Sequence, residues 1–221
     1  MPYNRRRTYR RKRNYRRKTS RASIYGRAGR QLWKDVKTLK NLINVEWKVQ
    51  NHVTTSTSVP NTGTVMLLNH LALGEDYNNR SGRQVRWKSL QWRCTTQKHA
   101  SATSSRVRML IVIDRQCKQA LPSASEILDS SVAPLIDGFR QLDARKRFVI
   151  LKDVMFLLNN DRPELTKTGY FKMDMKTVYD ASDNGDITDI YSNSLYMVMI
   201  GDEATNQPTH ETNVRLRYID N

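Results

Sequence analysis

The residues best suited to chemistry on a ligand are the arginines, lysines and tyrosines of the first thirty positions. This segment holds thirteen basic residues and no acidic one. Guanidinium groups neutralise phosphates and release counterions, while tyrosine rings offer faces on which bases stack. We therefore expect residues 1–30 to form a nucleic-acid-binding arm, with the binding residues Arg5, Arg6, Arg7, Arg10, Arg11, Lys12, Arg13, Arg16, Arg17, Lys18, Arg21, Arg27, Arg30, Tyr3, Tyr9 and Tyr15.

The basic charge of the chain is concentrated in this arm. Residues 1–40 hold sixteen basic groups and one acid (+15), whereas residues 41–221 hold 22 basic groups and 20 acids (+2), which together give the net charge of +17. The arm has almost nothing to bury, so it is not expected to fold alone. A solubilising or nuclear-targeting tail is the alternative, and targeting is compatible with nucleic-acid binding.

Catalytic chemistry finds no support in the remaining reactive residues. The sequence has no GxSxG and no GxxxxGK[ST] motif, and its two cysteines lack CxxC spacing and suit a reducing compartment. We expect a protein that is not an enzyme and needs no cofactor. No apolar run approaches the ~18–20 residues of a membrane span, so a membrane partner is not expected. The histidines lack metal-ligand spacing and are read as strand or loop residues: His52, His70, His99 and His210.

One acidic loop suggests a cation site only weakly. The sequence DNGDITD at 183–189 has the spaced aspartates of a calcium loop. It lacks the twelfth-position glutamate of an EF-hand and lies between two predicted strands. An acidic turn is the preferred interpretation.

A short amphipathic helix is expected to follow the arm, within residues 31–44. Leu32, Val36, Leu39 and Ile43 recur at spacings of four, three and four, which places them on one helical stripe. Such a stripe has to be covered, so we expect this helix to dock onto the body or onto a neighbouring copy.

The body, residues 45–221, is expected to be all-β. Short Val-, Ile-, Thr- and aromatic-rich runs are separated by turn residues, and helix is sparse. About eight strands with this spacing are typical of a sandwich or a jelly roll, in which two antiparallel sheets pack together, and not of βαβ units. The expected strands are 44–59, 64–73, 84–97, 106–115, 146–158, 168–180, 194–201 and 213–220, with a short helix at 121–128.

A second basic stretch lies within the body. Residues 77–113 contain no acid and include Trp87 and Trp92. Two interpretations stay open, a solvated strand face or a surface that continues the electrostatics of the arm. Tryptophan is common at interface anchors, so Trp47, Trp87 and Trp92 are candidate subunit contacts. The basic residues of this stretch are Arg80, Arg83, Arg86, Lys88, Arg93, Lys98, Arg106 and Arg108.

Three patches carry a resemblance to known proteins. NNRSGRQVRWKSLQWRC (78–94), RKRFVILKDV (145–154) and LYMVMIGDE (195–203) occur in this order behind the basic arm. They resemble the coat protein of satellite tobacco necrosis virus and the jelly-roll capsid proteins of small circular single-stranded DNA viruses. The resemblance extends loosely from the amphipathic helix to the C-terminal NVRLRYIDN.

The resemblance implies an eight-stranded single jelly roll that self-assembles into a small icosahedral shell of about sixty copies. Its basic arms would face the packaged single-stranded genome. The dense RRR and YRR blocks are more similar to circular-DNA-virus capsids than to the shorter arm of the satellite RNA virus. DNA is therefore expected over RNA, and the virion is the expected location.

Some satellite-virus shells bind calcium where carboxylates of neighbouring subunits meet. By resemblance, the matching positions are Glu46, Asp76 and Asp220. Ordinary surface acids are the alternative at these positions.

One further partner and one alternative function remain open. RRRTYRRKR and YRRK resemble nuclear import clusters, which would make a host import receptor a partner and the host nucleus a transient location. A cellular nucleic-acid-binding protein, ribosomal or chromatin-like and monomeric, is the alternative function. It would share the arm but would not require a body of eight strands.

Overall fold

The computed structural model describes residues 21–42, 47–131 and 134–220. Two compact units divide the chain, Met1–Val45 and Glu46–Asn221. The described part of the first unit is one helix, α1 (Arg21–Leu42). The described residues of the second unit form nine strands: β1 (Trp47–Ser58), β2 (Thr64–Leu67), β3 (Gln84–Gln97), β4 (Ser104–Asp114), β5 (Phe148–Asn159), β6 (Glu164–Tyr179), β7 (Ile190–Ser192), β8 (Ser194–Gly201) and β9 (Thr209–Asp220).

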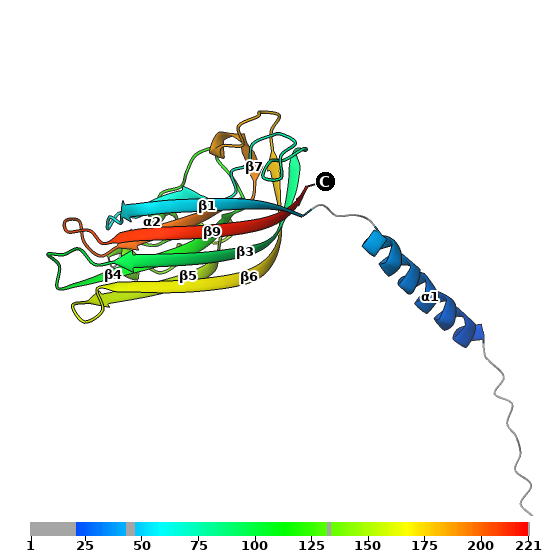
Figure 1. The fold of residues 1–221 in the computed structure, drawn as a ribbon, viewed down its shortest axis with the longest axis horizontal. Helices are drawn as coiled ribbons and strands as arrows, with labels where there is room; N and C mark the ends of the chain where they lie inside the picture. Colours follow the sequence, from blue (N-terminus) through cyan, green and yellow to red (C-terminus); the bar gives the residue numbers. More distant parts are fainter. Residues whose placement is uncertain (1–20, 43–46, 132–133, 221) are drawn as a thin grey trace, which may run out of the picture. The chain divides into compact units, whose positions relative to one another are not determined.

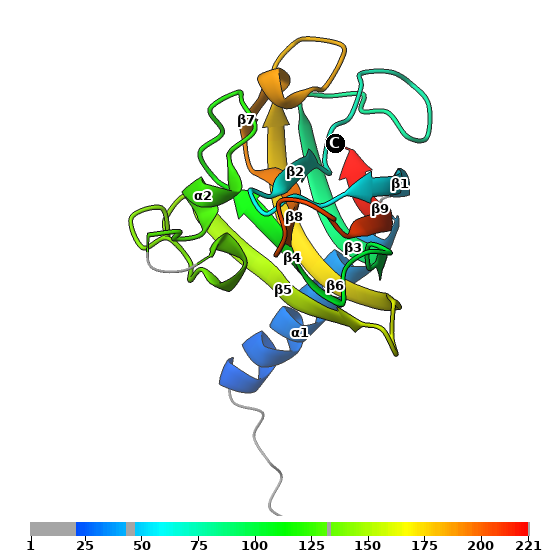
Figure 2. The ribbon, with the colours of Figure 1, turned by 90° about the vertical axis from the view of Figure 1, so that its left-hand side faces the viewer.

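The strands form two antiparallel sheets. One sheet has the order β1-β9-β3-β6-β7 and the other β2-β8-β4-β5, so neighbouring strands come from distant parts of the chain (Figures 1 and 2). Without β7, these are the two four-stranded sheets of a jelly roll, which confirms the predicted fold class. The three-residue β7 adds a short edge to β6 and is the difference from the eight expected strands.

The main core lies between the two sheets. Alternation along β3 places Val85, Trp87, Leu90, Trp92 and Cys94 on its buried side. They pack with inward residues of the other sheet in one apolar cluster. Each side chain of this size contributes about 1.5–3 kcal/mol when it is buried.

A second apolar cluster covers the outer face of the β2-β8-β4-β5 sheet. The segment 115–147 contains α2 (Ala124–Ile127) and the short 3-10 helix η1 (Leu135–Asp137). Its Ile127, Leu128 and Ile136 pack on the outward residues of β4 and β8. Both faces of β8 are therefore covered, which explains why all eight of its residues are buried.

Several elements differ from their predicted bounds, α1 and β2 most of all, while β6 and β9 begin at Glu164 and Thr209, ahead of the predicted positions 168 and 213. The helix α1 begins ten residues before position 31, because arginine and alanine favour helix although the apolar stripe starts only at Leu32. The strand expected at 64–73 ends at Leu67. The Asn69 side chain then replaces ladder bonds, since its amide donates to Thr177 Oγ1 and its oxygen accepts from Leu195 N. A second short 3-10 helix, η2 (Ile187–Asp189), precedes β7.

Candidate nucleic-acid interface

The two sheets differ in what covers their outer faces. Segment 115–147 covers the β2-β8-β4-β5 sheet. On the β1-β9-β3-β6 strands the outward positions are mostly exposed and polar, because none of the described elements of the unit Glu46–Asn221 packs over them. We call the outward side of these four strands the open face.

Basic side chains outnumber acidic ones on the open face. Its strand positions carry seven basic residues and three acidic ones. The basic residues are Arg86, Lys88, Arg93, Lys172, Lys176, Arg215 and Arg217, and the acidic residues are Glu164, Asp174 and Glu211. A surface with this surplus attracts a phosphate backbone without needing a particular base sequence.

Asp174 is already neutralised by neighbours on the face. Its Oδ1 accepts hydrogen bonds from Arg86 Nε at 2.6 Å and from Lys88 Nζ at 2.7 Å. These bonds lower the pKa of Asp174, so it stays ionised even in acid. Four other basic side chains of the open face have no hydrogen bond or ion pair within the described residues. They are Arg93, Lys172, Lys176 and Arg217.

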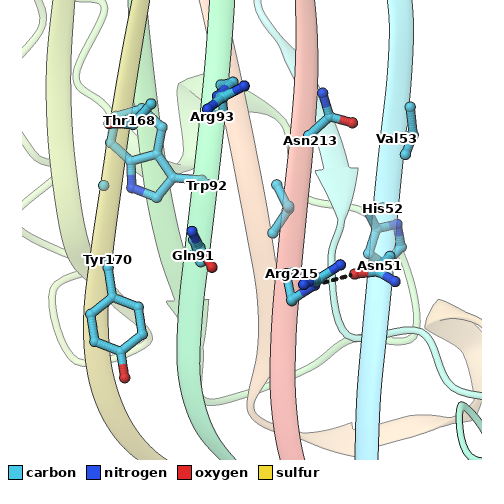
Figure 3. A pocket seen from close by; sticks show the side chains of 12 residues that line it. Asn51, His52, Val53, Gln91, Trp92, Arg93, Thr168, Tyr170, Asn213 and Arg215 are labelled. Atoms are coloured by element: carbon cyan, nitrogen blue, oxygen red, sulfur yellow. Dashed lines mark hydrogen bonds between the residues drawn. The ribbon is translucent and has the colours of Figure 1, made fainter.

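An open hollow of about 800 Å³ lies on this face (Figure 3). Strand register places Tyr170, Gln91, Arg215 and Asn51 in one row across β6, β3, β9 and β1. The next row is Thr168, Arg93, Asn213 and Val53. The hollow therefore joins an aromatic ring, amides and guanidinium groups, and none of its lining residues is acidic.

Most of the predicted arm residues lie outside the described residues. Positions 1–20 hold Arg5 to Lys18 of the predicted set and all three of its tyrosines. Arg21 begins α1, and Arg27 and Arg30 are exposed on it. Leu32, Val36 and Leu39 are exposed on the same helix, so the docking role of α1 stays a prediction.

The second basic stretch divides between the two sheets and the interior. Arg86, Lys88 and Arg93 reach the open face, which is compatible with both interpretations of the stretch. Arg80 is fully buried, and its guanidinium donates to the carbonyl oxygens of Leu71 and Gly82 at 3.1 and 3.0 Å. Arg106 and Arg108 lie on β4 in the other sheet, where they pair with aspartates.

Two of the three candidate interface tryptophans belong to the core, which corrects the prediction. Trp87 is 0 % exposed and Trp92 is 3 % exposed, so neither offers a surface to a partner. Trp92 instead covers Gly169 across the strand pair. Trp47 is 59 % exposed and remains a candidate contact. Phe139 and Leu142, two exposed apolar residues in loops, are further candidate contacts. The strand periodicity of the sequence does not single them out.

Of the three predicted calcium residues, the structure describes Asp76 and Asp220. The side chain of Asp220 is 5 % exposed, and its Oδ2 accepts from Ser81 N and lies 3.5 Å from Lys48 Nζ. Lys48 thus supplies the positive charge at this carboxylate. Glu46 lies outside the described residues, and Asp76 lies in an exposed loop. The described part of the chain has no group of three acids, histidines or cysteines that could hold a metal.

The acidic loop is built as a turn. Asp180 Oδ1 accepts from Ser182 N at 2.8 Å, and Asp189 Oδ2 accepts from Asp186 N at 3.0 Å. Carboxylates that accept backbone N–H groups in this way stabilise the turn locally. This agrees with the preferred interpretation of the loop.

The described helices include none long and apolar enough to cross a membrane.

Two histidines form an internal pair that sequence spacing did not indicate. The rings of His52 and His70 are 4.5 Å apart, edge to face, and Gln50 Nε2 lies 3.5 Å from His70 Nε2. Burial, with His70 as a further cause, lowers the pKa of His52 to about 4. Burial also lowers the pKa of His70, against the opposing effect of Asp186.

This pair predicts a loss of stability in mild acid. A histidine with pKa near 4 when folded and 6.5 when unfolded contributes its stability above pH 6.5 and loses it as the pH falls towards 4. For His52 we expect a loss of about 1–2 kcal/mol between pH 7 and pH 5. Urea unfolding of dissociated protein at both values measures it. The variant His52→Gln should show a smaller loss, and an equal loss in both proteins would contradict the assignment.

The fold and the open face define a jelly-roll protein with one basic sheet surface suited to nucleic acid. The model of the satellite tobacco necrosis virus coat protein family matches residues 16–221. The chain therefore belongs to this family and is a viral coat protein. The coat protein of Maize white line mosaic Satellite virus is 25 % identical over 209 residues, which covers 90 % of this chain and 95 % of that protein.

Solved virus structures show weaker likeness. A structure of Desmodium yellow mottle tymovirus has a TM-score of 0.33 and 10 % identity, and covers 80 % of this chain and 87 % of its own. The structure of Cocksfoot mottle virus has a TM-score of 0.34 and 11 % identity, with 79 % and 81 % covered. The assignment does not depend on either structure, because it follows from the family match.

Proposed function

We propose that this coat protein self-assembles into a small icosahedral shell and packages a single-stranded genome through its basic arm and its open face. The observation that carries the proposal is the seven-to-three surplus of basic residues on the only broad sheet surface left uncovered within the described residues of Glu46–Asn221. The basic arm is the second part of the proposal, since residues 1–30 carry thirteen basic residues and no acid.

The charge of the arm fits a packaging role. With about sixty copies, residues 1–40 at +15 each supply on the order of 900 positive charges against a genome of roughly one to two thousand phosphates. A protein that reads one short site does not need this excess. Family membership favours the shell over a monomeric cellular binding protein, which was the alternative.

For the genome we propose RNA. The expectation of DNA came from the likeness of the arm to circular-DNA-virus capsids. The family match and the relative reported above are both satellite-virus coat proteins. Neither supports the resemblance to DNA-virus capsid proteins. We therefore replace DNA by single-stranded RNA in the proposal.

Nuclease digestion of the extracted contents of purified particles tests this proposal. We expect nucleic acid that RNase degrades and DNase leaves intact. Degradation by DNase alone would restore the DNA assignment and overturn the RNA one. Particles that protect no nucleic acid would overturn the packaging function itself.

Calcium and nuclear import remain subsidiary proposals. A calcium site would have to be shared between subunits, since Asp220 is neutralised by Lys48 within its own protomer. Particle stability that is unchanged by a calcium chelator would reject it. For import, fusion of residues 1–30 to a fluorescent reporter without nuclear accumulation would reject the role.

A further inference from the structure

We propose that the hollow on the open face is a binding site for one nucleotide of a single strand, with Tyr170 as its stacking platform. This inference rests on the proposed function and names the residues with which the folded body, as distinct from the arm, holds the genome. Its parts are an exposed ring on β6, two guanidinium groups on β3 and β9, and the amide side chains of β1, β3 and β9 (Figure 3).

The aromatic part is Tyr170. Its side chain is 55 % exposed although it lies in the middle of a sixteen-residue strand. Its strand neighbour Gly169 has no side chain, and the same-face neighbours are Thr168 and Lys172. An exposed ring in this place contributes little to folding, but its free face suits a base. Stacking on an aromatic ring is tolerant of sequence, because every base has a π face.

The phosphate-binding part consists of Arg93 and Arg215. Arg215 Nε donates to Asn51 Oδ1 at 2.8 Å, which orients the guanidinium while leaving its other N–H groups available. The Arg93 side chain has no hydrogen bond or ion pair within the described residues. Because Tyr170 and Arg215 are two strands apart, their backbones are separated by about 10 Å. One nucleotide with its base on the ring and its phosphate on the arginine can cover this span.

The amide residue Gln91 lies between Tyr170 and Arg215, and Asn213 lies opposite Arg93 in the next row. Gln91 is the direct cross-strand partner of both Tyr170 and Arg215. An amide donates and accepts, so it can pair with polar groups on the edge of any base. The ring needs an unpaired base face, which favours a single strand over a duplex. No acid lines the hollow, so an anionic ligand meets no opposing charge there.

Ultraviolet crosslinking of intact particles tests the site directly. Short-wavelength irradiation, nuclease treatment and tryptic digestion should yield a nucleotide adduct on the peptide 168–172, which contains Tyr170, besides adducts on arm peptides. The variant Arg93→Gln/Arg215→Gln keeps Tyr170, so we expect about a tenfold lower yield on this peptide from the loss of two charge-assisted contacts. Arm adducts should not change. Tyr170→Phe should retain the adduct, and Arg145→Gln, an exposed arginine outside the open face, is the matched control.

The outcomes separate this site from the general function. Adducts confined to arm peptides, in particles that contain nucleic acid, would overturn the site and leave packaging intact. Particles without nucleic acid would overturn the proposed function and the site together. Binding of heparin by intact particles that depends on Arg93 and Arg215, with no adduct on peptide 168–172, would assign the hollow to an acidic polysaccharide and overturn the proposal.

Discussion

Deletion of residues 1–30 is expected to abolish genome packaging while the jelly roll stays folded. The deleted segment carries thirteen of the 38 basic residues and no acid. Loss of that many phosphate contacts should lower the affinity for a single strand by about three orders of magnitude or more. The fold should persist, because both apolar clusters lie wholly within the unit Glu46–Asn221.

The ratio of absorbance at 260 to that at 280 nm and the recovery of nuclease-protected nucleic acid measure packaging. Circular dichroism measures whether the jelly roll stays folded. A full-length protein with the arginines of positions 1–30 replaced by lysine is the matched control. It keeps the charge and should keep packaging, because counterion release depends on charge and not on guanidinium geometry. If the truncated protein still co-purifies with protected nucleic acid, the arm is not the main packaging element.

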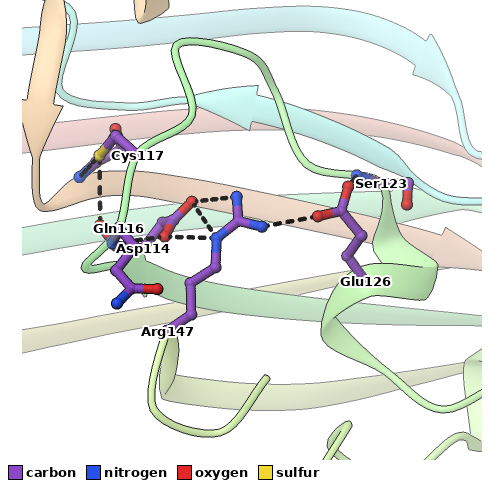
Figure 4. A network of polar contacts seen from close by, with 7 residues as sticks. Asp114, Gln116, Cys117, Ser123, Glu126 and Arg147 are labelled. Atoms are coloured by element: carbon purple, nitrogen blue, oxygen red, sulfur yellow. Dashed lines mark hydrogen bonds and ion pairs between the residues drawn. The ribbon is translucent and has the colours of Figure 1, made fainter. Parts of the chain in front are cut away.

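Replacement of Arg147 by methionine is expected to destabilise the body by about 3–5 kcal/mol. Asp114 is 0 % exposed and accepts from Arg147 Nε at 3.0 Å and from Arg147 Nη2 at 2.8 Å (Figure 4). Arg147 Nη1 also donates to Glu126 Oε2 at 2.8 Å. The substitution would leave the buried carboxylate without its counter-charge, which is the costly way to break such a pair.

This network matters because it fastens segment 115–147 to the end of β4. Arg147 precedes β5, Asp114 ends β4 and Glu126 lies in α2, so one guanidinium joins three elements. Urea unfolding measures the loss. Arg145→Met, two residues away and exposed, should stay within about 0.5 kcal/mol of the unsubstituted protein. The double variant Asp114→Asn/Arg147→Met should recover part of the stability. An unchanged stability of Arg147→Met would show that the ion pair contributes nothing.

The sequence predicts most of the strands, and it predicts which residues of β6 face outward. Alternation along 168–180 places Tyr170, Lys172, Asp174 and Lys176 on one side, and the structure exposes all four on β6. Period-two alternation is a local property, so it can be seen without knowing the partner strands. The basic arm is equally visible, because composition alone reveals it.

The burial of individual side chains depends on long-range strand pairing, which the sequence alone does not reveal. Arg80 and Arg93, for example, cannot be distinguished within the basic stretch. Only the fold buries the first against the carbonyl oxygens of distant loops and leaves the second free on the open face. Trp87 and Trp92 share this ambiguity, since a large aromatic residue suits a core and an interface equally. The rows that make the hollow join four strands, and no single segment contains that information.

The central claim is that this coat protein encloses a genome, and negative-stain microscopy of the nuclease-treated full-length protein tests it most directly. The same sample gives the ratio of absorbance at 260 to that at 280 nm. The account predicts uniform small spherical particles with a ratio typical of enclosed nucleic acid. Monomers without retained nucleic acid, across a range of salt and calcium concentrations, would contradict it.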